Sequence, residues 1–365
     1  HELGARVLAS ATESAGVRPE LVEQVNMGCV LPAGQGQAPA RQAALGAGLP
    51  ISAGAITLNK VCGSGMRALM VAANDLRCGD YSVVAAGGME SMTNAPYLIP
   101  GAREGLRLGN GSLIDSMVHD GLWDPYGDVH MGSCAELCAR EFAFSREEQD
   151  AYAEESYRRA REATEGGRFA DEIVTVEVEG RKGQKTRIEQ DEDPFRVDLS
   201  RMASLRPAFD KEGSITAGNA SNLSDGAAAM VLTRADWARE NDCRPMARVL
   251  AHASVAQAPQ WFTTAPVAAA RLALERAGLS ADRIDLFEVN EAFAVVALAF
   301  MKELGVDHDR INVHGGAVSL GHPIGASGAR IVVTLLHALR QREARLGCAA
   351  ICSGGGQGDA IFVEV

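Results

Sequence analysis

Apolar residues recur at helical spacing in segments that are followed by short, wholly apolar runs. Residues 1–17 and 66–80 carry an apolar side chain every three to four positions, which predicts amphipathic helices. Residues 81–88, YSVVAAGG, form a short apolar run ending in glycines, as buried strands do. The same alternation returns at 265–279 and 284–293. Both ends of the chain therefore predict an α/β organisation.

The middle of the chain, from about residue 93 to 223, is charged, rich in loops and dotted with glycine and proline. One amphipathic helix stands out there, at 145–164, where Ser145 and Glu148 have the spacing of a capping box. We therefore expect an N-terminal half, an inserted loop domain and a C-terminal half, in that order: 1–92 with 224–245, 93–223 and 246–365.

A segment near the C-terminus repeats one near the N-terminus. Four positions match at one constant offset: Ser64, Gly65, Arg67 and Leu76 align with Ser327, Gly328, Arg330 and Leu339. The apolar run that follows ends in Gly-Gly in both copies. A repeat of this length indicates two similar α/β halves, each a sheet covered by helices, whose strand ends place ligand-binding groups.

Residues 1–17 already form a predicted helix, and such a helix usually follows a strand. We therefore expect that a strand of the first sheet, with any targeting peptide, precedes the sequence given.

Composition narrows the classes of partner. The chain has 365 residues, of which 47% are hydrophobic and 22% charged, and its formal net charge is −12. This acidity argues against a nucleic-acid partner. The longest buried-looking run, 292–300, is too short to span a bilayer, so no membrane partner is expected. A phosphorylated ligand stays open, because its positive contacts can be local.

The eight cysteines include no C-x-x-C pair, which fits neither a disulfide framework nor a zinc site. Cys134 and Cys138 stand four apart and can share a helix face as buried thiols. Free thiols suit a reducing compartment. We expect the cytoplasm, with the mitochondrial matrix as the alternative.

Residues 59–68, NKVCGSGMRA, place Cys62 immediately before a predicted helix. The first turn of a helix offers free N–H groups and the positive end of the helix dipole, which lower the pKa of a cysteine there. The glycines permit a tight strand-to-helix turn and a close approach of substrate. A nucleophilic cysteine and a cysteine that only packs near a turn are equally compatible with this motif alone.

Three further stretches carry candidate chemistry. His322 stands in GHPIGASGAR, Asn290 and Glu291 stand in VNEAF at a strand end, and Cys352 opens CSGGG. A solvated loop histidine, a helix cap and a flexible turn are the structural alternatives. No G-x-G-x-x-G opens a helix, so a dinucleotide cofactor site is rejected.

Together, NKVCGSGM, NEAF, GHPIGASGAR and C-x-GGG resemble the thiolase family, in order and spacing, over nearly the whole chain. HMGSCAE (130–136), LRPAFDKEGSITAGNAS (205–221) and SDGAAA (224–229) also resemble family segments. EVNEAF, GGAVSLGHPIG and the long segment 101–117 favour the acetoacetyl-CoA thiolases. The resemblance implies the thiolase fold: two similar α/β halves packed as five αβαβα layers, with the loop domain inserted.

The activity implied by the resemblance is a reversible Claisen condensation of two acetyl-CoA to acetoacetyl-CoA and CoA, with CoA thioesters as substrates and no cofactor or metal. Cys62 would be acylated after His322 takes its proton. Cys352 would be the acid and base at the reacting carbon. Asn290 would hold a water that, with His322, faces the enolate oxygen. The N–H groups of Cys62 and Gly354 would face the tetrahedral oxyanion.

The inserted domain would carry the CoA site and the oligomer contacts. By resemblance, the pantetheine and nucleotide path is lined by His130, Met131, Leu205, Ala208, Phe209, Ala217, Gly218 and Ser221. The acyl pocket would be bordered by Phe262, Ala292 and Phe293. Four nearby basic residues could also contact the CoA phosphates: Arg181, Lys182, Arg187 and Arg196. The alternative for each of them is a charged side chain in a solvated turn.

Some positions depart from the family pattern. Pro194 or Phe195 stands where relatives with a potassium site carry tyrosine, which puts potassium activation in doubt. His314 stands where many relatives have asparagine, and no role is assigned to it. Phe262 replaces a frequent methionine, which bears on acyl chain length.

Residues 96–120 resemble a tetramer-forming loop, so a homotetramer is expected. The rival functions are a broad-range 3-ketoacyl-CoA thiolase of fatty-acid β-oxidation and, more remotely, a non-catalytic CoA-binding scaffold. Ketoacyl synthases share the fold, but Cys352 argues against them, because they use a second histidine there.

Overall fold

The computed structural model describes residues 1–180 and 183–365, and two four-stranded sheets organise it. The strand order of the first sheet is β10-β3-β1-β2, and that of the second is β11-β14-β13-β12. The strands of the first sheet are β1 (Gln24–Gly28), β2 (Gly54–Leu58), β3 (Val83–Ser91) and β10 (Asp225–Thr233). Those of the second are β11 (Arg248–Ala256), β12 (Leu286–Val289), β13 (Leu346–Ser353) and β14 (Gln357–Glu364).

The two sheets share one pairing scheme, as the repeat predicts. β1 runs parallel to β2 and β3, and β10 pairs antiparallel with β3. In the second sheet β12 runs parallel to β13, and β14 is antiparallel to β13. β11 adds a further antiparallel partner to β14. No described strand of the first sheet corresponds to β11 of the second sheet. Residues of β10, the edge strand of the first sheet, line a groove of about 1760 Å³. The strand expected before residue 1 stays a prediction.

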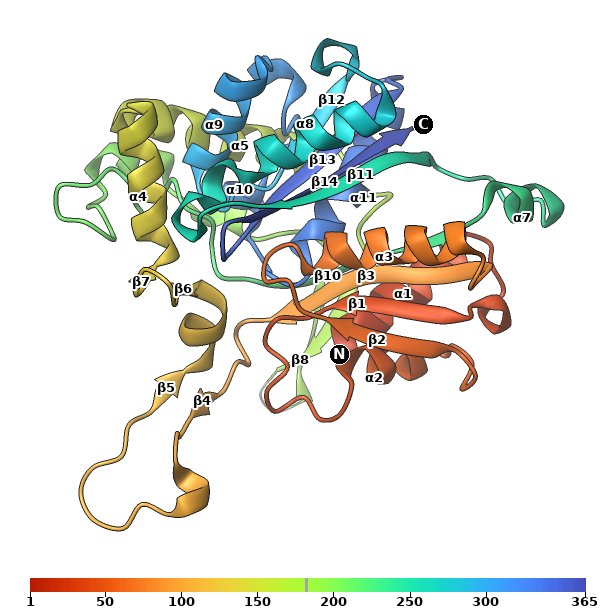
Figure 1. The fold of residues 1–365 in the computed structure, drawn as a ribbon, viewed down its shortest axis with the longest axis horizontal. Helices are drawn as coiled ribbons and strands as arrows, with labels where there is room; N and C mark the ends of the chain where they lie inside the picture. The colour runs from red at the N-terminus through yellow and green to blue at the C-terminus, as the bar shows by residue number, and fades with distance from the viewer. Residues whose placement is uncertain (181–182) are drawn as a thin grey trace.

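Helices separate and cover the sheets in five layers (Figure 1). The outer face of the first sheet carries α1 (Glu2–Ser14) and α2 (Pro39–Gly46), and the outer face of the second carries α8 (Ala265–Ala277) and α9 (Ala294–Leu304). The middle layer is α3 (Ser64–Cys78) with α11 (Ser327–Gln341), whose apolar side chains form one core with both sheets. The five-layer thiolase fold expected from the sequence is therefore confirmed.

The middle layer positions the functional loops, because α3 and α11 approach closely at their N-terminal ends. A Cβ atom added at Gly65 would lie 2.8 Å from the backbone nitrogen of Ala329, and one added at Gly328 would collide with the backbone of Met66. Only glycine allows this contact, and both glycines belong to the internal repeat. The loops that precede the two helices, carrying Cys62 and His322, are thereby drawn to the same region.

The inserted region contains more regular structure than expected. The capping box of α5 (Arg146–Glu165) is confirmed, with Glu148 N donating to Ser145 Oγ at 3.1 Å and Ser145 N donating to Glu148 Oε2 at 2.7 Å. A second helix, α4 (Met131–Phe142), was missed, and it buries Cys134 and Cys138 as expected for one face. The division into domains stays a prediction.

Short elements complete the chain. β4 (Tyr97–Leu98) and β5 (Ile114–Asp115) form the base of an arm that projects from the body (Figure 1). The others are the pairs β6 (Trp123–Asp124) with β7 (Val129–His130) and β8 (Val176–Glu179) with β9 (Lys185–Ile188), and the helices α6 (Asp193–Arg196), α7 (Ala235–Glu240) and α10 (Ala317–Leu320). No helix of the described chain is long and apolar enough to cross a membrane.

Candidate active site

Cys62 lies in a tight turn between β2 and α3. The residue before it, Val61, has a φ of +46°, a left-handed conformation that is uncommon for a β-branched residue. The residue after it must be small, because a Cβ atom at Gly63 would lie 2.5 Å from Ser353 Oγ. Lys60 Nζ pairs with Asp359 Oδ1 of β14 at 2.6 Å. The turn is therefore fastened to the C-terminal half.

The thiol of Cys62 is protonated at rest. Burial raises its pKa to about 12, although hydrogen bonds from the backbone N–H groups of Cys62 and Gly354 to the sulfur act in the opposite direction. The expectation of a lowered pKa is wrong here, because removal from water outweighs the first turn of α3, which begins only at Ser64. A base is needed to form the thiolate. The same two N–H groups converge on the Cys62 sulfur, and their role as the oxyanion site stays a prediction.

Cys352 faces Cys62 from the end of β13. Burial raises the pKa of the Cys352 thiol well above its ordinary value, and the nearby Cys62 thiol raises it further. Its side chain is fully buried. The structure thus brings together two thiols that lie 290 positions apart, one from each half.

His322 is neutral, and its hydrogen bonds select one tautomer. Burial, followed by the charge of Arg330, lowers its pKa to about 3. Ser327 Oγ donates to the carbonyl of Pro323 at 3.0 Å and lies 2.6 Å from His322 Nδ1, so Nδ1 must donate to Ser327. His322 Nε2 is then left with its lone pair. Ile324, two residues on, packs in one cluster with Cys62.

Asn290 is fully buried beside that imidazole. Its Nδ2 lies 3.4 Å from His322 Nε2, and its backbone N–H donates to Ala350 O at 3.0 Å. Its Oδ1 has no hydrogen-bond partner among the described residues. The helix-cap alternative fails, because the N-cap of α9 is Phe293. The side-chain amide is therefore free to hold a small polar group next to His322.

Acid should destabilise the fold through His322. The pKa of His322 is about 3 in the folded chain and 6.5 ordinarily. Between these two pH values the histidine is therefore protonated in the unfolded chain but neutral in the folded chain. The free energy of unfolding should therefore fall by up to about 1.4 kcal/mol per pH unit below about pH 6. Urea unfolding of wild type and His322→Asn from neutral pH to about pH 4.5 tests this. In a plot of the free energy of unfolding against pH, the slope for His322→Asn should be smaller than that for wild type by close to one proton. Equal slopes would contradict the low pKa assigned to His322.

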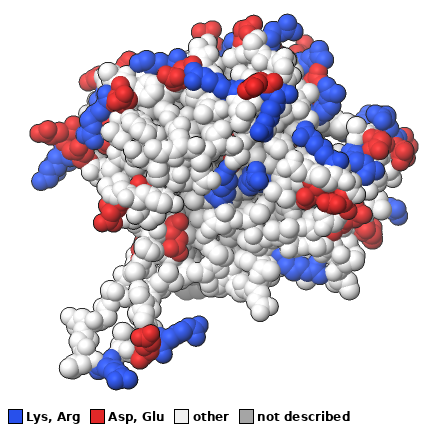
Figure 2. All heavy atoms as spheres, viewed as in Figure 1, with Lys and Arg blue, Asp and Glu red and all other residues white. Residues whose placement is uncertain are grey.

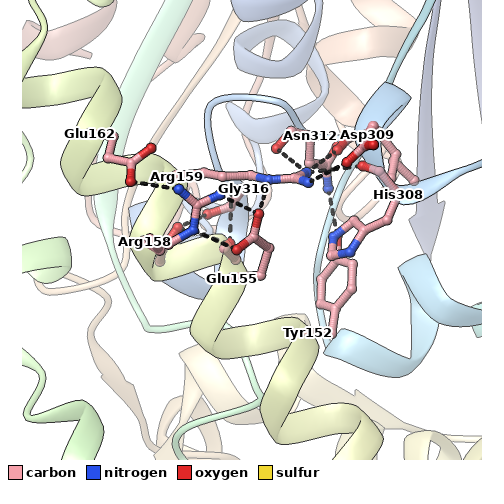
Figure 3. A network of polar contacts seen from close by, with 12 residues as sticks. Tyr152, Glu155, Arg158, Arg159, Glu162, His308, Asp309, Asn312 and Gly316 are labelled. Atoms are coloured by element: carbon pink, nitrogen blue, oxygen red, sulfur yellow. Dashed lines mark hydrogen bonds and ion pairs between the residues drawn. The ribbon is translucent and has the colours of Figure 1, made fainter.

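Glu291 is the hub of a buried polar network beneath Asn290. Its carboxyl group accepts hydrogen bonds from Tyr152 Oη at 2.7 Å, Ser156 Oγ at 2.8 Å and Asn312 Nδ2 at 2.7 Å, and also from Val318 N at 3.1 Å. Figure 3 shows Tyr152 of α5 and Asn312 within the same network. The sequence singled out Glu291 beside Asn290 without a role. The contacts make it the group that ties the inserted helix α5 to the loop of Asn290.

Glu90 was missed by the sequence analysis. Its buried carboxyl group accepts hydrogen bonds from the backbone N–H groups of Val30, Leu31 and Gly325, at 2.9, 3.2 and 2.9 Å. It thereby joins the first sheet to the loop that carries His322. An acidic residue at the end of the apolar run of β3 was the signal that could have identified it.

Aromatic side chains predicted for the substrate path lie in one cluster. The rings of His130 and Phe209 stack with centroids 4.7 Å apart, and Phe209 meets Phe293 edge-on at 6.1 Å. Phe293 in turn meets Phe262 at 6.4 Å. Met131 lies beside the predicted oxyanion site, with its terminal carbon 3.9 Å from the position of a Cβ at Gly354. Met131, Phe262 and Phe293 belong to the same apolar core cluster as Cys352, and Phe209 packs against it, so these residues form an aromatic wall on the side of that thiol.

The other residues predicted for the path belong to the segment 205–221. Ser221 Oγ donates to Ala292 O at 3.0 Å, which fixes the end of this segment to the VNEAF loop. Gly218 packs against Leu205 so closely that a Cβ atom would lie 2.8 Å from its side chain. Ala208 and Ala217 are exposed on the same segment. These roles stay predictions.

The basic residues considered for CoA phosphates are engaged with acidic neighbours. Arg187 pairs with Glu189 at 2.7 Å and Arg196 with Glu192 at 2.5 Å, and all four side chains are exposed. This favours solvated ion pairs over a phosphate site. Arg181 and Lys182 lie outside the described residues. Within the described residues, no group of three or more His, Cys, Asp or Glu is arranged to hold a metal ion.

Comparison with known proteins matches the chain along its whole length. The thiolase N-terminal domain model matches residues 1–236, and the thiolase C-terminal domain model matches residues 243–365. An acetyl-CoA acetyltransferase of Pseudomonas aeruginosa is 51% identical over 361 residues, covering 99% of this chain and 92% of its own length. Acetyl-CoA acetyltransferase 2 of Arabidopsis thaliana is 50% identical, covering 100% and 91%.

A solved structure has the same fold. The crystal structure of a thiolase from Ascaris suum in complex with coenzyme A superposes with a TM-score of 0.94 at 43% sequence identity. The similarity covers 99% of this chain and 92% of the other.

Proposed function

The chain belongs to the thiolase family, and from this premise we propose that it is an acetyl-CoA C-acetyltransferase acting through an acetyl-Cys62 intermediate. The reaction joins two acetyl-CoA into acetoacetyl-CoA and CoA, and it is reversible. The observation that carries the proposal is the pair of thiols, the partly buried Cys62 and the fully buried Cys352, which lie close together across the two halves. Relatives named acetyl-CoA acetyltransferase at about 50% identity support it.

In the first half-reaction His322 acts as the base. Its Nε2 lone pair accepts the proton of the Cys62 thiol, which is neutral at rest. The thiolate attacks the thioester carbonyl, and the developing oxyanion lies at the N–H groups of Cys62 and Gly354. Collapse expels CoA as a thiolate, which takes the proton from the imidazolium. Because His322 titrates far below neutrality, it returns that proton readily.

In the second half-reaction Cys352 handles the proton on carbon. The Cys352 thiol first gives its proton to the Nε2 lone pair of His322, and the thiolate then removes a proton from the methyl group of a second acetyl-CoA. The resulting enolate attacks acetyl-Cys62, and collapse expels the Cys62 thiolate, which takes back the proton that His322 holds. The raised pKa of Cys352 makes this thiolate a strong base, and it makes the thiol the resting form that protonates the enolate in the cleavage direction. The amide of Asn290 and Nε2 of His322 bound the place of the enolate oxygen.

Mass spectrometry of the protein mixed with acetyl-CoA tests the covalent step. We expect an added acetyl group on the peptide that contains Cys62 and its release by free CoA. The rate of cleavage of 3-ketoacyl-CoA substrates of rising chain length then separates the proposal from a broad-range 3-ketoacyl-CoA thiolase. The aromatic wall of Phe262, Phe293 and Phe209 should favour the four-carbon substrate. Equal rates at long chain lengths would favour the rival function.

Replacing Asn290 with alanine should lower turnover without unfolding the protein. The side chain makes only one hydrogen bond in the described chain, to His322, so its loss leaves little unpaired. Loss of one oxyanion donor typically costs about 2.7–4 kcal/mol of transition-state stabilisation, or about 10²–10³ in kcat. Steady-state kinetics measures the loss, and circular dichroism checks the fold. A folded variant with near-normal kcat would remove Asn290 from the mechanism.

The projecting arm supports a homotetramer. Figure 2 shows the arm extending away from the body, with charges gathered toward its tip. The exposed apolar side chains of the arm face solvent in the single chain, and they are Tyr97, Ile99, Leu106, Leu108 and Leu113. Apolar side chains in such number on an extended segment mark an interface. Light scattering with and without the substitution Leu108→Glu would show whether the arm holds the assembly.

The proposed reaction needs no cofactor beyond its CoA thioester substrates. The cysteines of the described chain are all free, which supports a reducing compartment such as the cytoplasm.

A further inference from the structure

A cavity of about 330 Å³ lies where the C-terminal part of α5, the residues just beyond it, the loop around residue 314 and the end of α11 meet. Neither Cys62 nor any other residue predicted for the substrate path lines it. Its wall contains three arginines and one histidine: Arg159, Arg168, Arg342 and His314. We call this cavity the arginine pocket.

The positive charge of the arginine pocket is only partly neutralised by the chain. Arg159 pairs with Glu155 at 2.7 Å and lies 3.9 Å from Asp309, whose charge also acts on Arg342. Arg168 and Arg342 make no ion pair and no side-chain hydrogen bond with any described residue. The pKa of Arg342 is lowered by burial and then by the charges of Arg159 and Arg168, so the three guanidinium groups lie close enough to repel one another. The carboxyl group in the wall, that of Glu162, already pairs with Arg158 at 2.5 Å. In a chain with a net charge of −12, such a concentration of cations is unusual.

Arg159 is held rigidly at the inner side of the pocket. Its Nη1 donates to the backbone carbonyls of His308 and Ile311 at 3.0 and 2.7 Å, and its Nε donates to Glu155 at 2.7 Å. Figure 3 shows its side chain reaching from α5 to this loop. A fixed guanidinium loses less conformational entropy when a ligand binds than a free one does.

His314 adds a neutral donor to the wall. Its side chain is 6% exposed, and its Nδ1 has no hydrogen-bond partner among the described residues. Burial and the charges of Arg342 and Arg168 lower its pKa to about 4, so the ring is uncharged at neutral pH. A buried ring nitrogen without a partner costs free energy unless a ligand or water satisfies it. Nothing in the sequence assigned this histidine a role.

We propose that the arginine pocket binds the phosphate group of a small molecule, either inorganic phosphate or a phosphate monoester. Guanidinium groups match phosphate oxygens with paired hydrogen bonds, and the two of Arg168 and Arg342, which have no acidic partner among the described residues, favour a dianion. A volume of about 330 Å³ is at the lower end of ligand sites, which suits a phosphate with a few further atoms. The proposal is independent of the proposed function, because it uses none of the residues of the thiol site.

Titration calorimetry with inorganic phosphate at constant ionic strength tests the proposal. CoA is present at saturating concentration, so that phosphate contacts in the CoA site are already occupied. We compare wild type with Arg168→Gln and Arg342→Gln. The matched control is Arg340→Gln, which removes the same charge from the exposed end of α11 but from outside the pocket. Circular dichroism and urea unfolding, expected to be equal in all four proteins, show that each is folded.

We expect saturable binding to wild type and Arg340→Gln, and a Kd at least tenfold higher for Arg168→Gln and for Arg342→Gln. Methyl phosphate distinguishes the two sources of the ligand: tighter binding than inorganic phosphate identifies a monoester, and weaker binding identifies free phosphate. The proposal is overturned if wild type shows no saturable binding, or if the two pocket variants bind phosphate as tightly as Arg340→Gln does.

Discussion

Replacing Cys62 with serine is expected to abolish both acetylation and turnover. A serine hydroxyl is a much weaker acid than a thiol, and no charged base stands beside it, because His322 is neutral with a pKa of about 3. Loss of the nucleophile in other covalent enzymes lowers kcat on the order of 10⁶-fold. The measurements are the mass of the Cys62 peptide after mixing with acetyl-CoA and the rate of thiolysis of acetoacetyl-CoA.

Cys352→Ser is the matched control, because it makes the same change of atom at the second thiol. This variant should still form acetyl-Cys62, since the first half-reaction does not use Cys352. Its turnover should be nearly lost, because no thiolate is available at the reacting carbon. Acetylation of both variants, or of neither, would show that the two cysteines do not divide the reaction as proposed.

Replacing Glu291 with alanine should destabilise the whole fold. The carboxyl group accepts hydrogen bonds from three buried side chains and one backbone N–H, and it links α5 of the inserted region to the loop of Asn290. Its removal leaves those donors unpaired away from water, at about 1–3 kcal/mol for each that finds no new partner. We expect a loss of about 3 kcal/mol or more in the free energy of unfolding, measured by urea denaturation.

Two milder substitutions make this result specific to the network. Tyr152→Phe removes the hydrogen bond that Tyr152 donates to Glu291 and the one that it accepts from Asn312 Nδ2. Because Asn312 Nδ2 keeps Val289 O and Glu291 as acceptors, the substitution should cost only about 0.5–1.5 kcal/mol. Glu291→Gln keeps the volume but accepts fewer hydrogen bonds, so its loss should lie between the two. If Glu291→Ala costs no more than Tyr152→Phe, the network is not a major contributor to stability.

Local structure was largely predictable, because it depends on neighbouring residues. The capping box of Ser145 and Glu148 and the apolar pattern of α5 lie within one stretch of 20 residues, and both were identified. The helix α4 was missed because the interpretation treated residues 93–223 as loop-rich, although the buried face of α4, which includes Gly132, Cys134 and Ala135, recurs at helical spacing. The arginine pocket was out of reach for a different reason, since its residues come from three separate parts of the chain.

The sequence by itself determined the two similar α/β halves, which follow from the internal repeat. Its motifs resemble the thiolase family, and this resemblance implied the five-layer fold and the roles of the two thiols, the imidazole and the amide. Only the tertiary structure decided the protonation states of Cys62 and His322, and the parts that Glu90 and Glu291 take in holding their loops. The reason is that desolvation and hydrogen-bond pairing depend on groups far apart in the chain, and here they outweigh the local effect of a helix terminus.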